Sequence, residues 1–215
     1  MFKIYKPVLL KLAVIILLAS CNYNNLVTEN KQFDPNIIIH LNPHWIAFYQ
    51  NRIENYSSDK FVFDSTWTVR AWLNGNVLAD SEPGFDHNFS PYLIYSKDKS
   101  QYLDLDSYQY VFDQDSTGHL ILMGTEPDQE VNWVNRKTGE VKRIAFTGPG
   151  STYEDARWIN NEEVILFGKA NNRVFIEVII LPMKKSILYV YPDSLQRNDN
   201  YLQKVRLKGI KFEEL

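Results

Sequence analysis

The chain has 215 residues, a formal net charge of −3 and 45% hydrophobic residues, and it contains a single cysteine. This length suits one domain with a sizeable core and excludes a miniature scaffold held together by disulfides. One cysteine also excludes an internal disulfide and a metal site built from several thiolates. Because the sequence has no basic stripe, which binding to nucleic-acid phosphates requires, we expect no nucleic-acid partner.

The first segment has the layout of a secretory signal. Lys3, Lys6 and Lys11 supply positive charge, an apolar core follows at Leu12–Leu18, and small residues come next. Even counted from Val8, the apolar run is about eleven residues long and is broken by Lys11, whereas a helix needs roughly 20 to cross a bilayer. The segment therefore predicts export rather than a membrane span.

The end of this segment, Leu18-Ala19-Ser20-Cys21, resembles the lipobox of bacterial lipoproteins. The resemblance implies that Cys21 becomes the mature N-terminus and carries a thioether-linked diacylglycerol, usually with an N-acyl chain as well. One acyl chain binds a membrane only marginally, whereas two or three anchor a protein stably. An ordinary secretory signal followed by a chance cysteine is the alternative. The lipobox is favoured because the only cysteine stands where the motif requires it.

Three regions are expected: a signal peptide at residues 1–20, a polar tether at 21–32 and a single domain at 33–215. A flexible tether of this length spans only about 20 Å, so the domain would stay near the bilayer. Asn22, rather than Asp, follows the cysteine, and no acidic residue occurs before Glu29. By resemblance to enteric-type lipoproteins, this predicts an outer-membrane protein that faces the periplasm.

Beyond residue 33 the dominant hydrophobic period is two, which predicts an all-β domain. The clearest alternation is Thr66–Leu73, and Asn74-Gly75 after it is a strong hairpin-turn signal. Helical signals are nearly absent. We also expect short strands at Trp45–Tyr49 and Phe61–Phe63 and a loop at Asp80–Pro91.

The middle of the chain contains an internal repeat of strands and turns. The turns Arg136–Gly139 and Pro182–Lys185 coincide to within one residue when the sequence is laid over itself at an offset of 45 residues. Val174–Leu181 is apolar on both faces apart from Glu177, as expected of a central strand. The predicted strand–turn–strand segments are 91–105, 112–124, 131–146, 156–167 and 173–191.

Residues 91–191 resemble blades of periplasmic WD40-like β-propellers. Ser96-Lys97-Asp98-Lys99 occupies the place of the family's Ser-Pro-Asp-Gly turn, Thr138-Gly139-Glu140 that of its Thr-Gly-Glu turn, and Pro182-Met183-Lys184 replaces the latter in the second unit. The resemblance implies blades of four antiparallel strands, in a small four-bladed propeller or an open stack. Antiparallel meanders of another kind are the alternative. A final strand at Val205–Phe212, with Gly209 as a bulge, could pair with the N-terminal unit.

Metal and cofactor sites have little support in the sequence. His40 and His44 have the spacing of two zinc ligands on a helix, but Pro43 lies between them. Asp113–Gly118 resembles half of a calcium loop, but the position of the bidentate acid is Gly124, so a turn is favoured. His87 and His119 have no nucleophile motif around them. We expect no metal and no cofactor.

Three carboxylates are candidates for catalysis. Asp104 and Asp106 fall on one face of a predicted strand, and glycosidases use such a pair of carboxylates. Two carboxylates on one strand face are more often simply exposed to solvent. Glu177 interrupts an apolar strand and is therefore the carboxylate expected to have a shifted pKa. Its alternative is a place at an edge or a pairing with Arg or Lys.

Trp72 shares a predicted strand face with Arg70, an arrangement that can stack on a sugar or anchor a protein partner. Packing of Trp72 in the core is the alternative, and it is favoured. The sequence thus predicts a lipid-anchored binding or scaffolding module that recognises an envelope protein or glycan. The alternative is an envelope enzyme, such as a glycan hydrolase that uses paired carboxylates.

The lipobox generates a direct test. Cys21→Ser removes the sulfur that would carry the diacylglycerol, so the variant is expected to leave the membrane fraction and appear in the soluble fraction. Fractionation of cells, followed by immunoblotting, measures this. Continued sedimentation of the variant with membranes, in the absence of a bound partner, would contradict the lipid anchor.

Overall fold

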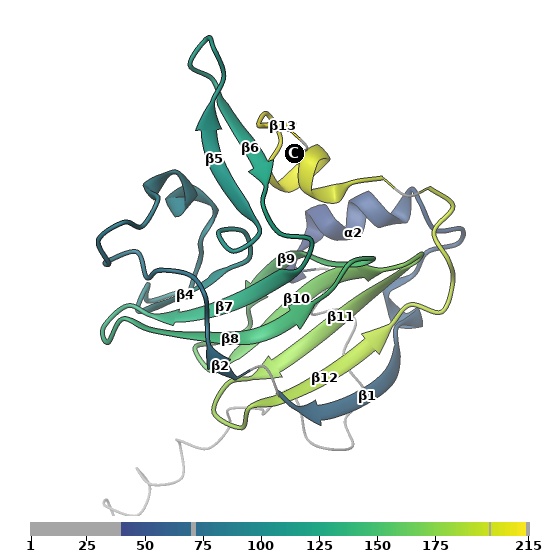
Figure 1. Cartoon of the computed structure of the whole chain (residues 1–215). Helices are drawn as coiled ribbons and strands as arrows, with labels where there is room; N and C mark the ends of the chain where they lie inside the picture. Colours follow the sequence, from purple (N-terminus) through teal and green to yellow (C-terminus); the bar gives the residue numbers. More distant parts are fainter. Residues whose placement is uncertain (1–39, 70–71, 198, 214–215) are drawn as a thin grey trace, which may run out of the picture. The chain divides into compact units, whose positions relative to one another are not determined.

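The computed structural model describes residues 40–69, 72–197 and 199–213, all of which belong to one compact unit, Asp34–Leu215 (Figure 1). Strands dominate these residues and form sheets of five, five and three strands, so the prediction of a domain built mainly of β-strands is confirmed. Cys21, the tether at 21–32 and Arg70 lie outside the described residues. Within the described ranges, each helix is too short or too polar to cross a bilayer.

The strands of the first five-stranded sheet, here sheet A, lie in the order β1-β12-β11-β10-β9, and all neighbours are antiparallel. β11 is central and almost entirely buried, as its apolar sequence predicts. The five strands are β1 (Val62–Thr68), β9 (Ser151–Trp158), β10 (Glu163–Ala170), β11 (Arg173–Ile180) and β12 (Lys185–Val190).

The second five-stranded sheet, here sheet B, has the order β2-β8-β7-β4-β3 and is also antiparallel. Its strands are β2 (Leu73–Asn74), β3 (Ile94–Tyr95), β4 (Gln101–Asp104), β7 (Gln129–Asn135) and β8 (Glu140–Thr147). The third sheet pairs the β5–β6 hairpin with a parallel strand β13. These strands are β5 (Tyr110–Gln114), β6 (Leu120–Gly124) and β13 (Lys211–Glu213).

The internal repeat is real, but the blades of a propeller are not present. Sheets A and B each contain a meander of four antiparallel strands, and each gains a fifth strand from the N-terminal part. No closed or propeller arrangement occurs among the described residues, so that prediction is corrected. The physical reason is that the two strands of the N-terminal segment, which was expected to form another blade, join different sheets. β1 pairs with the β12 edge of sheet A, and β2 pairs with the β8 edge of sheet B.

Sheets A and B share one hydrophobic core. Leu103 and Val131 of sheet B belong to the same buried cluster as Leu166 and Phe175 of sheet A. A second cluster packs the other face of sheet B, including Tyr102, against the loop before β3, the β5–β6 hairpin and the C-terminal segment. The central strands of sheet B, β4 and β7, are therefore buried on both faces.

Trp45–Tyr49, predicted as a strand, lies in a helix, α2 (Pro43–Gln50). Asn42 caps the helix by accepting a hydrogen bond from the backbone N–H of Trp45, and Pro43 occupies the first helical turn, where a missing N–H costs nothing. The buried positions 45, 46, 48 and 49 follow the helical period. This spacing and the Asn-Pro start were the signals that identify the helix.

The hairpin expected at Asn74-Gly75 does not form. β1 ends at Thr68 on sheet A, and the chain then crosses to sheet B, where Leu73 pairs with Arg143. Gly75 is not among the glycines with positive φ, so it does not make the predicted turn. Glycine is needed there because the backbone passes close to a neighbouring side chain: a Cβ at this position would lie 2.8 Å from Cγ1 of Val141.

The C-terminal strand is shorter than predicted and has a different partner. Leu202–Arg206 forms a π-helical turn, η4, and Gly209 has φ +97° in the turn after it rather than in a strand bulge. Only β13 is extended, and it pairs with β6 instead of the N-terminal unit. Two short 3-10 helices complete the described elements, η2 (Ser58–Lys60) and η3 (His87–Tyr92), the latter within the expected loop region.

Close packing at Gly168 of β10 generates a stability prediction. A Cβ at this position would meet the ring of Phe175 and lie 2.6 Å from the backbone oxygen of Thr152. Gly168→Ala should therefore lower the free energy of unfolding by about 1–3 kcal/mol. Urea denaturation measures the change, with Gly124→Ala as the control, since nothing lies within 4 Å of a Cβ there. Equal stability of the two variants would contradict the packing argument.

Candidate functional site

Strand β9 carries two adjacent buried acids, Glu154 and Asp155. The pairing of β9 with β10 shifts at this point: Asp155 lies opposite Phe167 and Tyr153 opposite Gly168, so Glu154 is an extra residue in a β-bulge. Because the bulge interrupts the alternation, both acids face the side of sheet A that packs on α2, whereas Tyr153 faces the core shared with sheet B.

The two acids act as anchors. Glu154 accepts hydrogen bonds from Nε1 of Trp45 at 3.0 Å and from the hydroxyl of Tyr49 at 2.7 Å. Asp155 accepts them from Nδ2 of Asn42 and the hydroxyl of Tyr201, each at 3.0 Å. Burial raises the pKa of Glu154 above its usual range. We assign these acids to the attachment of α2 and the C-terminal segment rather than to chemistry.

Asp104 and Asp106 are buried, so the expectation that they lie on a solvated strand face is wrong. Asp104 ends β4, and its carboxylate accepts hydrogen bonds from the backbone N–H groups of Asp106 and Ser107, which closes a local turn. Asp106 forms a two-pronged ion pair with Arg206 of η4. Each carboxylate therefore has a structural partner, and they do not form a catalytic pair.

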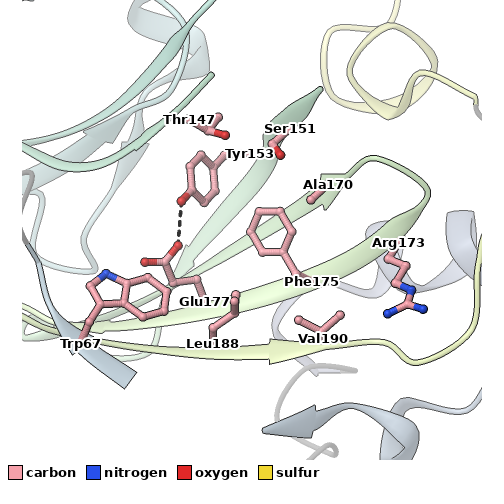
Figure 2. A pocket seen from close by; sticks show the side chains of 10 residues that line it. All are labelled: Trp67, Thr147, Ser151, Tyr153, Ala170, Arg173, Phe175, Glu177, Leu188 and Val190. Atoms are coloured by element: carbon pink, nitrogen blue, oxygen red, sulfur yellow. Dashed lines mark hydrogen bonds between the residues drawn. The ribbon is translucent and has the colours of Figure 1, made fainter. Parts of the chain in front are cut away.

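A cavity of about 180 Å³, the Glu177 pocket, lies on the core-facing side of sheet A (Figure 2). Because side chains alternate along β11, Arg173, Phe175 and Glu177 share this face. Most of the wall is apolar. The residues that line the pocket are Trp67, Thr147, Ser151, Tyr153, Ala170, Arg173, Phe175, Glu177, Leu188 and Val190.

Glu177 is only 3% exposed and is held by two hydroxyl groups. Tyr153 donates to Oε2 at 2.7 Å, the contact drawn in Figure 2, and Ser186 donates to Oε1. Burial raises the pKa of Glu177, although both hydrogen bonds act in the opposite direction. The expected shift in the pKa of Glu177 is therefore present. The alternative, an edge position or a pairing with Arg or Lys, does not describe Glu177, which lies in a central strand and whose partners in the described structure are hydroxyl groups.

A second hollow, the Trp72–Trp133 groove, has a volume of about 370 Å³. The two indole rings stack with centroids 5.9 Å apart and an interplanar angle of 28°, and Nζ of Lys184 lies 5.5 Å from the Trp72 ring. Nε1 of Trp133 donates to Oε1 of Gln101. The residues that line the groove are Trp72, Gln101, Trp133, Glu140, Asn161, Glu162, Leu181, Pro182 and Lys184.

Trp72 combines the two roles considered from the sequence. It is half-buried, since it packs against the core shared by the two sheets, and it also lines the groove. Its predicted neighbour Arg70 lies outside the described residues. Sequence reasoning missed Trp133, Tyr153 and Ser186 because each belongs to a strand whose position beside Trp72 or Glu177 is set by the tertiary fold.

The other sequence candidates are surface features. His40, His44, His87 and His119 are exposed. The calcium-like run Asp113–Gly118 ends β5 and forms the predicted turn, in which Asp115 accepts hydrogen bonds from the backbone N–H groups of Thr117 and His119. Hydrogen bonds to Thr117 and His119 lower the pKa of Asp115 to about 2. A group of three or more metal-ligating side chains is not found in the part of the chain that the structure describes.

No family model, no curated protein and no solved structure matched the chain. The two hollows are therefore the features that indicate what the protein can bind. Both hollows have mostly apolar walls, but the groove combines two indole rings with amide and charged side chains, whereas the pocket surrounds one buried acid.

The raised pKa of Glu177 predicts how stability depends on pH. The folded state holds the proton of Glu177 more tightly than the unfolded state, so stability falls as pH rises from about 4.5 towards the raised pKa. Glu177→Gln should therefore lose less stability than the wild type over this range, even though Glu154 still contributes a slope. Urea denaturation at several pH values measures this, with Glu82→Gln, an exposed acid, as the control. Parallel pH profiles for wild type and Glu177→Gln would contradict the prediction.

Proposed function

We propose that the chain is a lipid-anchored binding module of the bacterial cell envelope and that its Trp72–Trp133 groove recognises a glycan. The lipobox Leu18–Cys21 supports the anchor, and Asn22 after it, with no acidic residue before Glu29, supports an outer-membrane location facing the periplasm. The observation that carries the binding site is the pair of indole rings set among polar side chains in one hollow. Trp133 belongs to β7 of sheet B, and Trp72 directly precedes β2 at the edge of the same sheet.

The rings supply the apolar half of sugar recognition. One face of a pyranose ring presents only C–H groups, whose partial positive charge suits the negative π face of an indole. Trp72 and Trp133 are both half-buried, so part of each side chain is accessible in the groove. Stacking of a sugar on an anchored indole costs little conformational entropy, because the ring is already fixed by core contacts.

The polar side chains supply partners for sugar hydroxyl and acetamido groups. Nε2 of Gln101 donates to the backbone oxygen of Asn161 at 3.1 Å, while its oxygen accepts from Trp133. Nδ2 of Asn161 in turn donates to Oδ2 of Asp98 at 3.1 Å. These contacts join the β3–β4 turn to the β9–β10 turn and hold the amides in place before a ligand binds.

Hydrolysis of a glycan is the second candidate. The carboxylates considered from the sequence do not serve it, because Asp104 closes a turn and Glu177 lines the other hollow. Glu140 and Glu162, however, both line the groove. A glycosidase requires two carboxylates that flank the scissile bond, so the same groove offers the residues on which an enzyme would depend.

The groove is tested with the full chain in detergent on a glycan array, followed by calorimetry with an N-acetylglucosamine tetramer. Trp133→Ala should weaken glycan binding at least ten-fold, about 1.4 kcal/mol, because it removes one stacking surface. Asn161→Ala, a change at an exposed turn residue, should weaken it without a packing defect. Trp67→Ala, which alters only the Glu177 pocket, is the matched control.

Failure of every glycan to bind, or equal affinity of Trp133→Ala and the wild type, would contradict the glycan proposal. Chromatography of the incubated tetramer separates binding from hydrolysis. Shorter products that disappear in Glu140→Gln or Glu162→Gln would favour the enzyme over the binding module.

A further inference from the structure

We infer that the Glu177 pocket is a second binding site, and that its ligand is a small organic cation with an apolar body. Nothing in the glycan proposal uses this pocket, and the two hollows have no lining residue in common. The inference rests on three features of the pocket: an acid without a counter-charge, aromatic rings around it and a volume that limits the ligand.

The acid in the pocket has no positively charged partner among the contacts described for it. The partners of Glu177 are the hydroxyls of Tyr153 and Ser186, which donate hydrogen bonds but carry no positive charge. Among the residues described as lining the pocket, Arg173 is the one cation, and it is exposed. It lies four residues along β11 from Glu177, roughly 13 Å at the usual strand rise. A buried carboxylate is stabilised by a close counter-charge, and a ligand cation would supply one.

Aromatic rings favour the same ligand. Trp67 of β1, Tyr153 of β9 and Phe175 of β11 all line the pocket around Glu177 (Figure 2). Tyr153 and Phe175 meet edge to face with centroids 5.5 Å apart. An organic cation near such rings is attracted by their π electrons, and the attraction grows when water is excluded. Apolar contacts to Leu188 would then hold the body of the ligand.

The volume limits the size of the ligand. An apolar cavity of about 150 Å³ accommodates benzene, so a pocket of about 180 Å³ has room for one ring or a short branched chain with an amino group. A fatty acid or another anion fits the charge poorly, because its carboxylate would lie beside Glu177 inside the pocket. Benzylammonium matches both the size and the charge.

Binding of a cation is coupled to the proton of Glu177. Burial raises the pKa of this acid, and a bound ammonium group favours its ionised form. Complex formation should therefore release a proton at pH values below the raised pKa, and affinity should increase as pH rises. The groups that face the carboxyl group are Tyr153, Ser186 and the apolar wall; Arg173 lies further along the strand.

Calorimetry on the full chain in dodecyl maltoside tests the inference with three ligands of one shape: benzylammonium, benzyl alcohol and benzoate. We expect benzylammonium to bind at least ten-fold more tightly than benzyl alcohol, and benzoate to bind most weakly. In Glu177→Gln, which keeps the side-chain shape, the preference for the cation should fall to two-fold or less. Trp133→Ala is the matched control and should bind benzylammonium like the wild type.

Trp67→Ala provides a second variant if Glu177→Gln fails to fold, since the Trp67 side chain is 37% exposed. It should weaken benzylammonium binding several-fold and leave glycan binding unchanged. Three results would each overturn the inference: no benzylammonium binding, benzyl alcohol or benzoate binding as tightly, or an unchanged cation preference in Glu177→Gln. Glycan binding lost in Trp133→Ala but retained in Trp67→Ala shows that the two sites fail or succeed separately.

Discussion

The bulge at Glu154 in β9 is the constraint on which the rest of the structure depends. With strict alternation back from Ala156, which faces the shared core, Glu154 would enter that core and Tyr153 would face α2. The extra residue reverses this outcome. It sends both acids to the helix side and keeps Tyr153 on the core side, where its hydroxyl reaches Glu177. One inserted residue therefore positions both the anchors of the helix and the partner of the pocket acid.

The buried acids explain how segments outside the two large sheets are held. α2 precedes the first strand and η4 follows the last strand of sheet A, and neither belongs to a sheet. Tyr201, immediately before η4, donates to Asp155, and Arg206 within η4 pairs with Asp106. A buried polar group that loses its partner costs about 1–3 kcal/mol, so these contacts fix the two segments more specifically than apolar packing alone.

The sequence predicted those features that local chemistry determines. The turns at Gly139 and at Pro182–Lys185 and the central strand β11 follow from turn residues and from one apolar run. The edge pairings of β1 and β2 depend on strands more than 60 residues away and have no local signal. α2 was missed because a short aromatic segment fits both periods. Glu177 was singled out correctly by its isolation in an apolar strand, but its hydroxyl partners come from other strands.

The two hollows lie at different places along two sheets that share one core. Strands of both sheets contribute to each of them or to its rim: Thr147 of β8 lines the pocket beside residues of sheet A, and Trp133 of β7 lines the groove beside Leu181. Along one strand and its turn, Phe175 and Glu177 line the pocket, and Leu181 and Pro182 line the groove. The buried C-terminal end of β11, residues 178–180, lies between these two sets, so one closely packed strand separates the mostly apolar pocket from the groove.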